Sequence, residues 1–158
     1  MSLRDQMKEC DIFDNAVLRH GFTDYNRDYE MTVNSIVGPM PSGLYSYLFR
    51  GCVEAACKSN VLVHSPSLDD VFIDYQAWEA AGTPDGFVWG VKWADAYPGW
   101  RYIEKSPSAA NYSKKLSIEM HEVIIETNTY TIDLVFHDLL VTALPATASD
   151  GHWGKKNG

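Results

Sequence analysis

Cysteine and long hydrophobic runs are both scarce in this sequence. The 158 residues include three cysteines, Cys10, Cys52 and Cys57, an odd number that cannot pair completely within one chain. Cys52 and Cys57 lie in a segment that alternates like one strand, so we expect their side chains on opposite faces. Free thiols and the missing signal-peptide pattern predict a cytoplasmic protein. No apolar run approaches the roughly 20 residues of a membrane helix, so no membrane partner is expected.

Positive charge is also in short supply. The chain has 13 Lys and Arg residues against 21 Asp and Glu residues, which gives a formal net charge of -8 at pH 7. Such a field repels phosphate backbones and anionic lipid headgroups, so nucleic acid and membrane surfaces are not expected partners. The same field would steer a basic protein partner, although many acidic domains are acidic only for solubility.

Catalytic and cofactor motifs are absent. The sequence has no phosphate-binding loop and no serine elbow flanked by glycines. The histidines are scattered, without the spacing of a metal site; they are His20, His64, His121, His137 and His152. We therefore predict no catalytic residue, no metal and no cofactor, and we favour a protein that is not an enzyme.

Hydrophobic residues are plentiful. They make up 46% of the chain, and aromatic residues alone make up 13%, which is ample for one core in a chain of this length. We predict a single domain over residues 1–144. The small, polar and glycine-rich residues 145–158 are expected to form a flexible tail.

The spacing of apolar residues predicts an α+β fold with two main helices, one short helix and a mainly antiparallel sheet of about five to six strands. Two main helices are expected, one over residues 3–18 with a stop at Gly21 and one from Ser67 to a stop at Gly82. Ser106 and Pro107 are expected to open the short helix, which runs to about Leu116. The strands are expected over residues 28–37, 45–53, 87–93, 100–103, 118–126 and 130–143.

Two of the expected hairpins resemble each other. Residues 29–33 can be laid on residues 121–125, and residues 48–50 on residues 135–137, with a shorter turn in the second copy. This indicates two similar ββ units packed into one sheet. Any two amphipathic hairpins share such a pattern, so duplication and convergence both remain open.

The densest polar stretch is the first candidate site. It supplies His20, Asp24, Tyr25, Arg27 and Asp28 between the expected first helix and first strand. These residue types suit acid–base chemistry or the binding of a polar ligand, in a pocket that could face Arg50. Turn formation and structural ion pairs explain the same residues without a ligand.

An aromatic stretch is the second candidate site. Trp93, Tyr97 and Trp100 lie among glycine and proline residues near an expected turn. Aromatic rings with polar edges can anchor a protein interface. Alternating aromatic residues on a strand also serve as core, which is the alternative explanation.

Four runs of residues together resemble a family of small bacterial proteins of unassigned role, the YxiG-like proteins. The runs are His20–Tyr25, Tyr47–Ala55, Pro84–Gly90 and Leu134–Asp138, and the likeness extends over roughly residues 15 to 144. The Bacillus member that gives the family its name has a gene neighbourhood associated with a cell-wall toxin system. The resemblance therefore implies a toxin-immunity or accessory role, and it transfers no catalytic residue.

Three functional hypotheses follow. The first is a non-enzymatic domain, of the toxin-immunity kind or another, that binds a basic protein through an acidic face with aromatic residues. The second is an enzyme or small-molecule-binding protein that uses the polar stretch around His20. The third is a homo-oligomer in which a sheet edge or exposed tryptophans pair with a second copy.

Overall fold

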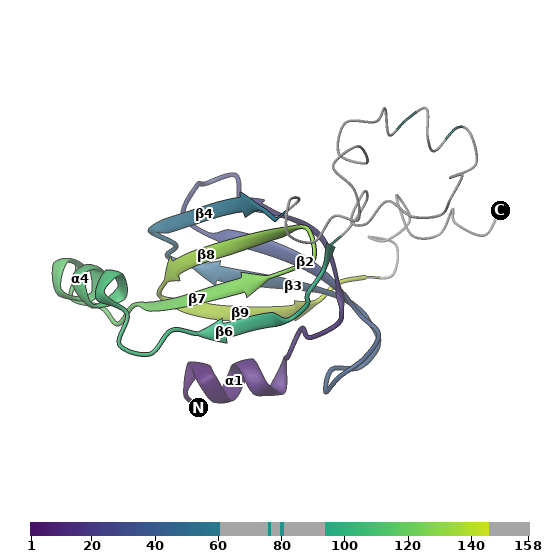
Figure 1. Cartoon of the computed structure of the whole chain (residues 1–158). Helices are drawn as coiled ribbons and strands as arrows, with labels where there is room; N and C mark the ends of the chain where they lie inside the picture. The colour runs from purple at the N-terminus through teal and green to yellow at the C-terminus, as the bar shows by residue number, and fades with distance from the viewer. Residues whose placement is uncertain (61–75, 77–79, 81–93, 146–158) are drawn as a thin grey trace.

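Two antiparallel sheets pack face to face in the computed structural model, which describes residues 1–60, 76, 80 and 94–145 (Figure 1). One sheet has the order β5-β1-β2-β3-β9 and the other β4-β8-β7-β6. The strands are β1 (Ala16–Phe22), β2 (Tyr29–Ser35), β3 (Gly43–Arg50), β4 (Glu54–Ser59), β5 (Ala94–Asp95), β6 (Gly99–Tyr102), β7 (His121–Glu126), β8 (Tyr130–Phe136) and β9 (Asp138–Ala143). The helices are α1 (Leu3–Glu9) and α4 (Pro107–Leu116).

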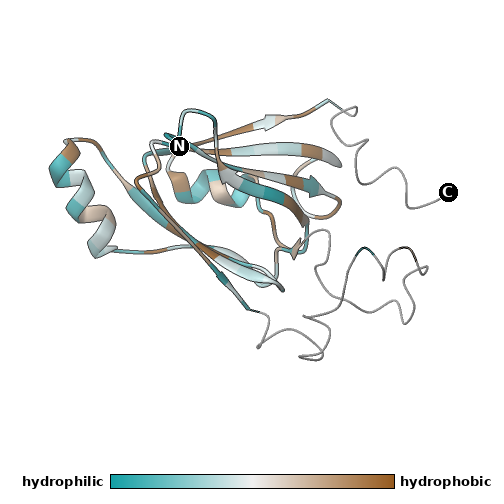
Figure 2. Ribbon diagram, turned by 90° about the horizontal axis from the view of Figure 1, so that it is seen from above, coloured by the Kyte–Doolittle hydropathy of each residue, from teal (hydrophilic) through white to brown (hydrophobic). Residues whose placement is uncertain are grey.

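The α+β class and the antiparallel pairing are confirmed, whereas the single sheet of five to six strands is wrong. Alternation along a strand shows which side chains are buried, but it does not show which sheet the strand joins. Figure 2 shows this alternation of hydrophobic and hydrophilic residues along the strands. The predicted helix from Ser67, apart from residues 76 and 80, lies outside the described residues, as do the strand over 87–93 and nearly all of the tail.

The predicted first helix is too long. α1 ends at Glu9, where the N–H of Cys10 still donates to the carbonyl of Gln6, and Ala16 already starts β1. Gly21 lies inside β1 and does not stop a helix. Apolar residues between 12 and 18 fit helical and strand spacing equally well, and pairing with β2 decides in favour of the strand. None of the described helices could span a membrane.

Both similar hairpins are present, but they lie in different sheets. β2 pairs with β3 so that Tyr29 faces Phe49, and β7 pairs with β8 so that His121 faces Phe136. After each hairpin the chain crosses to the opposite sheet, because β4 pairs with β8 and β9 pairs with β3. The resemblance in sequence therefore corresponds to equal register, and the prediction of one shared sheet is wrong.

The two crossings meet at one corner of the molecule. The N–H of His137 donates to the carbonyl of Arg50 over 2.9 Å. Gly51 adopts a φ of 60°, and a Cβ placed there would lie 3.2 Å from the Cβ of His137. This turn ends the strand that was predicted to continue to residue 53, so buried Cys52 precedes β4 and exposed Cys57 lies on it. The expectation that both cysteines share one strand is wrong.

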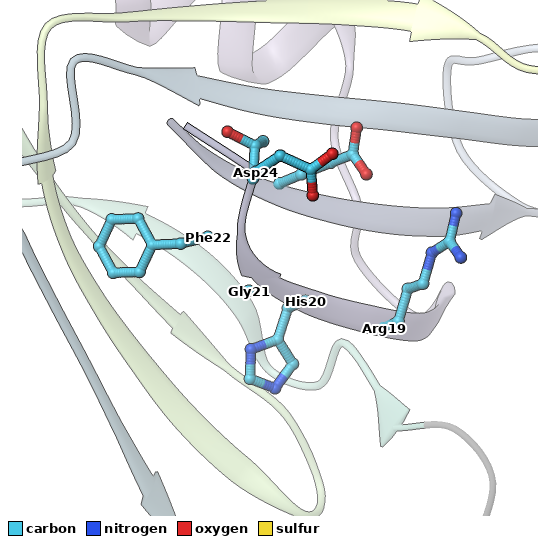
Figure 3. A pocket seen from close by; sticks show the side chains of 7 residues that line it. Arg19, His20, Gly21, Phe22 and Asp24 are labelled. Carbon is cyan, nitrogen blue, oxygen red and sulfur yellow. The ribbon is translucent and has the colours of Figure 1, made fainter. Parts of the chain in front are cut away.

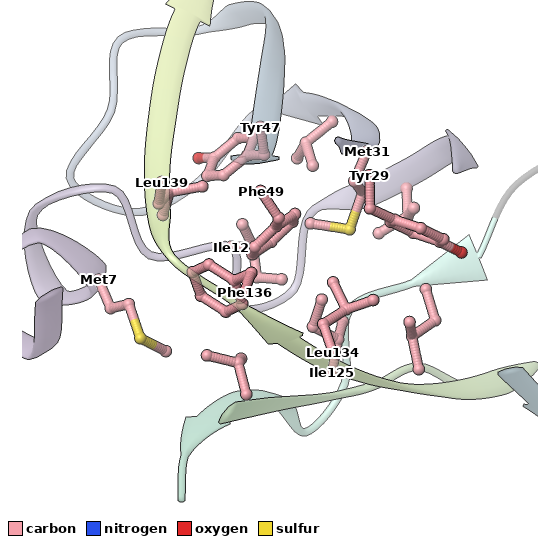
Figure 4. Packing of buried hydrophobic residues seen from close by; sticks show 14 of the residues in the cluster. Met7, Ile12, Tyr29, Met31, Tyr47, Phe49, Ile125, Leu134, Phe136 and Leu139 are labelled. Carbon is pink, nitrogen blue, oxygen red and sulfur yellow. The ribbon is translucent and has the colours of Figure 1, made fainter. Parts of the chain in front are cut away.

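The core fills the space between the sheets. Phe49 and Phe136 meet edge to face across it, with ring centroids 4.9 Å apart (Figure 4). Each is fully buried. Burial of a side chain of this size stabilises a fold by about 1.5–3 kcal/mol. The cluster also contains Met7, Ile12, Tyr29, Met31, Tyr47, Ile125, Leu134 and Leu139.

The short helix is confirmed at its predicted position. The side chain of Ser106 accepts a hydrogen bond from the N–H of Ala109 over 3.0 Å, and Pro107 occupies the first turn. Ala109 packs with Met120 and Val135 outside the main core. α4 therefore lies at one end of the sheets, as Figures 1 and 2 show.

We predict that Gly51→Ala lowers the free energy of unfolding by about 1–2 kcal/mol, because alanine is strained at positive φ and its Cβ crowds His137. Gly51→Asn should cost less, since asparagine tolerates this conformation better. Urea denaturation of the three proteins measures both effects. Equal stability of all three would contradict the strained corner.

Candidate functional site

The polar stretch between β1 and β2 contributes to a pocket of about 420 Å³. Its lining residues are Arg19, His20, Gly21, Phe22, Thr23, Asp24 and Glu30. Figure 3 shows the His20 ring directed away from Arg19 and Asp24. Arg19 is the neighbour of His20 on β1, so strand alternation places these two side chains on opposite faces. The pocket therefore includes two of the predicted residues, His20 and Asp24, but their side chains do not converge.

His20 is packed among aromatic residues. Its Nδ1 shares a short hydrogen bond with the hydroxyl of Tyr29, and its ring centroid is 4.6 Å from that of Tyr130. Burial lowers the pKa of His20, and burial raises the pKa of Tyr29 to about 12. Both groups are therefore neutral at pH 7, an arrangement that suits packing better than acid–base catalysis.

The other predicted polar residues lie outside the pocket lining. Tyr25 is 87% exposed, and Arg27 is exposed as well. Asp28 accepts a hydrogen bond from the N–H of Gly51 over 2.9 Å. Arg50 forms a two-pronged pair with Asp138, with distances of 2.7 and 2.6 Å. Asp28 and Arg50 thus stabilise the corner where the strands cross.

The second candidate site is formed by loops at the end of the sheets away from α4 (Figure 1). There, four large apolar side chains on three loops are exposed, and we call them the end surface. They are Phe13 at 46%, Ile36 at 63%, Val37 at 44% and Tyr97 at 57% of full exposure. The rings of Phe13 and Tyr97 are in contact, with centroids 5.8 Å apart. This surface includes one residue of the predicted aromatic site, Tyr97.

Asn15 joins the three loops and is 1% exposed. Its Oδ1 accepts hydrogen bonds from the N–H groups of Ile36 and Val37 over 2.8 and 3.0 Å, and its Nδ2 donates to the carbonyl of Val37 over 2.9 Å. Its own carbonyl accepts from the N–H of Ala96 over 2.9 Å. A buried amide with these bonds is costly to disturb, so the loops are fixed relative to one another.

The two tryptophans of the predicted aromatic site, Trp93 and Trp100, are not among the four residues of the end surface. Trp100 is half-buried and meets Tyr47 edge to face at 5.7 Å, within the core. Trp93 lies outside the described residues. Phe13, Ile36 and Val37 were not predicted as site residues, because apolar spacing places Phe13 in a helix over residues 3–18 and the other two in a strand over residues 28–37. Only the Gly38–Pro39 break beside Val37 indicates a loop there.

Carboxylates gather on the outer face of the second sheet. Glu54, Glu122 and Asp133 come from β4, β7 and β8, and the hydroxyls of Ser108 and Ser106 donate to the first two. Burial, a hydrogen bond with Glu122 and the neighbouring negative charges raise the pKa of Asp133 to about 6. Within the described residues, no group of three His, Cys, Asp or Glu side chains could hold a metal ion.

We predict that His20 titrates below its value in the unfolded chain, because burial disfavours its charged form. Stability from neutral His20 is complete above the unfolded pKa near 6.5 and is lost as the pH falls below it. His20→Gln should therefore flatten the acid side of the stability curve. NMR titration measures the pKa, and a value at or above that of the unfolded chain would contradict the packing described.

We predict that Asp133→Asn raises the free energy of unfolding at pH 8, because it removes a charge from a repulsive cluster. The gain should shrink as the pH falls through about 6 and should vanish near the ordinary aspartate pKa of about 4. Thermal denaturation at several pH values measures it. Asp24→Asn, at an exposed position, is the control, and an identical profile for both variants would argue against the cluster.

A match to a family model agrees with the resemblance in sequence. A solved structure described as an uncharacterized protein from Neisseria gonorrhoeae is similar at 8% identity and a TM-score of 0.39, over 84% of this chain and 93% of that one. No curated protein matches the chain. The model of the family described as YxiG-like protein matches residues 1–151. The chain therefore belongs to the YxiG-like protein family.

Proposed function

We propose that this chain is a non-enzymatic protein-binding domain and that the end surface is its binding site. The observation that supports this most is the exposure of Phe13, Ile36, Val37 and Tyr97 together, on loops that the buried Asn15 fixes. Contact between water and this cluster of apolar side chains is unfavourable. A protein partner that covers the cluster removes that contact, which favours binding. Fixed loops also lose little entropy on binding.

The setting that we propose is the bacterial cytoplasm, and immunity to a toxin is one form that such binding could take. A small-molecule site in the His20 pocket is the second candidate, and it rests on the pocket itself. We favour the end surface because Arg27, Asp28 and Arg50 do not line that pocket. Self-association is less favoured, because each copy carries a net charge of -8.

The test is affinity purification of the tagged full chain from its native host, followed by mass spectrometry. The double variant Phe13→Ala, Tyr97→Ala should lose the co-purifying protein, because it removes the central contact area. Leu116→Ala, Ile118→Ala is the matched control, since these residues are 47% and 43% exposed on and beside α4. It should retain the partner.

Both double variants must first show unchanged thermal unfolding. Equal recovery of the partner by the two variants would place the binding site elsewhere. Recovery of no specific protein by the unaltered chain would contradict the proposal itself.

A further inference from the structure

The end surface has an acidic border. Asp14 directly follows Phe13, and Asp95 lies two residues before Tyr97. The N–H of Asp14 donates to the carbonyl of Ala96 over 2.8 Å, so both carboxylates belong to the same pair of joined loops. Both carboxylates therefore lie on the same two loops as the aromatic contact.

These carboxylates repel one another. Partial burial and the nearby charge of Asp14 raise the pKa of Asp95. In the described part of the chain, residues 10–18, 34–46 and 94–100 form this end, and none of these three segments contains Lys or Arg. Within the described residues, neither carboxylate takes part in an ion pair. A cation brought by another molecule would therefore relieve the repulsion.

We infer that the end surface binds a protein partner through an arginine side chain, which stacks on the Phe13–Tyr97 pair and is neutralised by Asp14 and Asp95. This inference rests on the proposed function and names the partner's chemistry. Aromatic rings attract a cation placed within about 6 Å of the ring centroid, and carboxylates bind guanidinium through paired hydrogen bonds. Ile36 and Val37 are exposed on the loop that Asn15 joins to that of Phe13, and they offer apolar surface to the same partner.

Arginine fits this surface better than lysine. The planar guanidinium is less strongly hydrated than an ammonium group, so it stacks on aromatic faces and pairs with carboxylates at the same time. A second copy of this chain is a poorer occupant, because its corresponding surface carries the same two carboxylates. Charge complementarity thus selects a basic segment of a different protein.

The test uses a phage-displayed library of random peptides selected on the full chain. Peptides that also bind the Phe13→Ala, Tyr97→Ala variant are removed. The affinities of the selected peptides are then measured for the unaltered chain, for Asp14→Asn, Asp95→Asn and for the control Glu104→Gln, Glu119→Gln. The control removes the same two charges at exposed positions elsewhere. Each selected peptide is also tested with its arginines replaced by lysine.

We expect the selected peptides to be rich in arginine beside apolar residues. Asp14→Asn, Asp95→Asn should weaken binding by roughly tenfold or more, arginine-to-lysine peptides should bind more weakly, and the control should change affinity little. Peptides that need Phe13 and Tyr97 but are indifferent to Asp14 and Asp95 would overturn this inference and leave the proposed function standing. If no selected peptide depends on Phe13 and Tyr97, both are overturned.

Discussion

The exchange of strands between the two sheets is the constraint on which the rest of the structure depends. Each hairpin can bury its inner face only against the other, and each sends its next strand across to complete the opposite sheet. Both crossings pass through one corner, where His137 bonds to Arg50 and Gly51 leaves room for the approach. Phe49 and Phe136 then meet in the core, because both lie at the same register position of their hairpins.

The exchange of strands also determines which surface groups are free to bind a partner. At the crossing corner, Asp28, Arg50 and Asp138 are occupied with one another and with the backbone. At the end away from α4, the loops before β1, after β2 and before β6 meet around Asn15. Because the interior amide satisfies the loop backbone, the apolar side chains of those loops are free to face outward. The backbone groups of these loops are hydrogen-bonded to the buried Asn15, so the exposed side chains remain available for a partner.

Much of the fold follows from the sequence, and the candidate site follows only in part. Alternation located β2, β3, β7 and β8, and the Ser106–Pro107 cap located α4. The partition into two sheets could not be predicted, because it depends on contacts such as Phe49 with Phe136 between residues far apart in sequence. The end surface was missed for the same reason. Phe13 fits the spacing of a core helix, but α1 ends at Glu9 and β1 begins at Ala16, so Phe13 lies in the loop between them.

Hydrogen exchange of the backbone amides, measured for the chain alone and with its partner bound, tests the central claim most directly. In the free chain, the amides of Ile36 and Val37 should exchange slowly although they lie in an exposed loop, because both donate to Asn15. On binding, further slowing should be confined to residues 11–15, 36–38 and 96–99. Slowing centred instead on residues 19–24, with rapid exchange at Ile36 and Val37, would contradict the account.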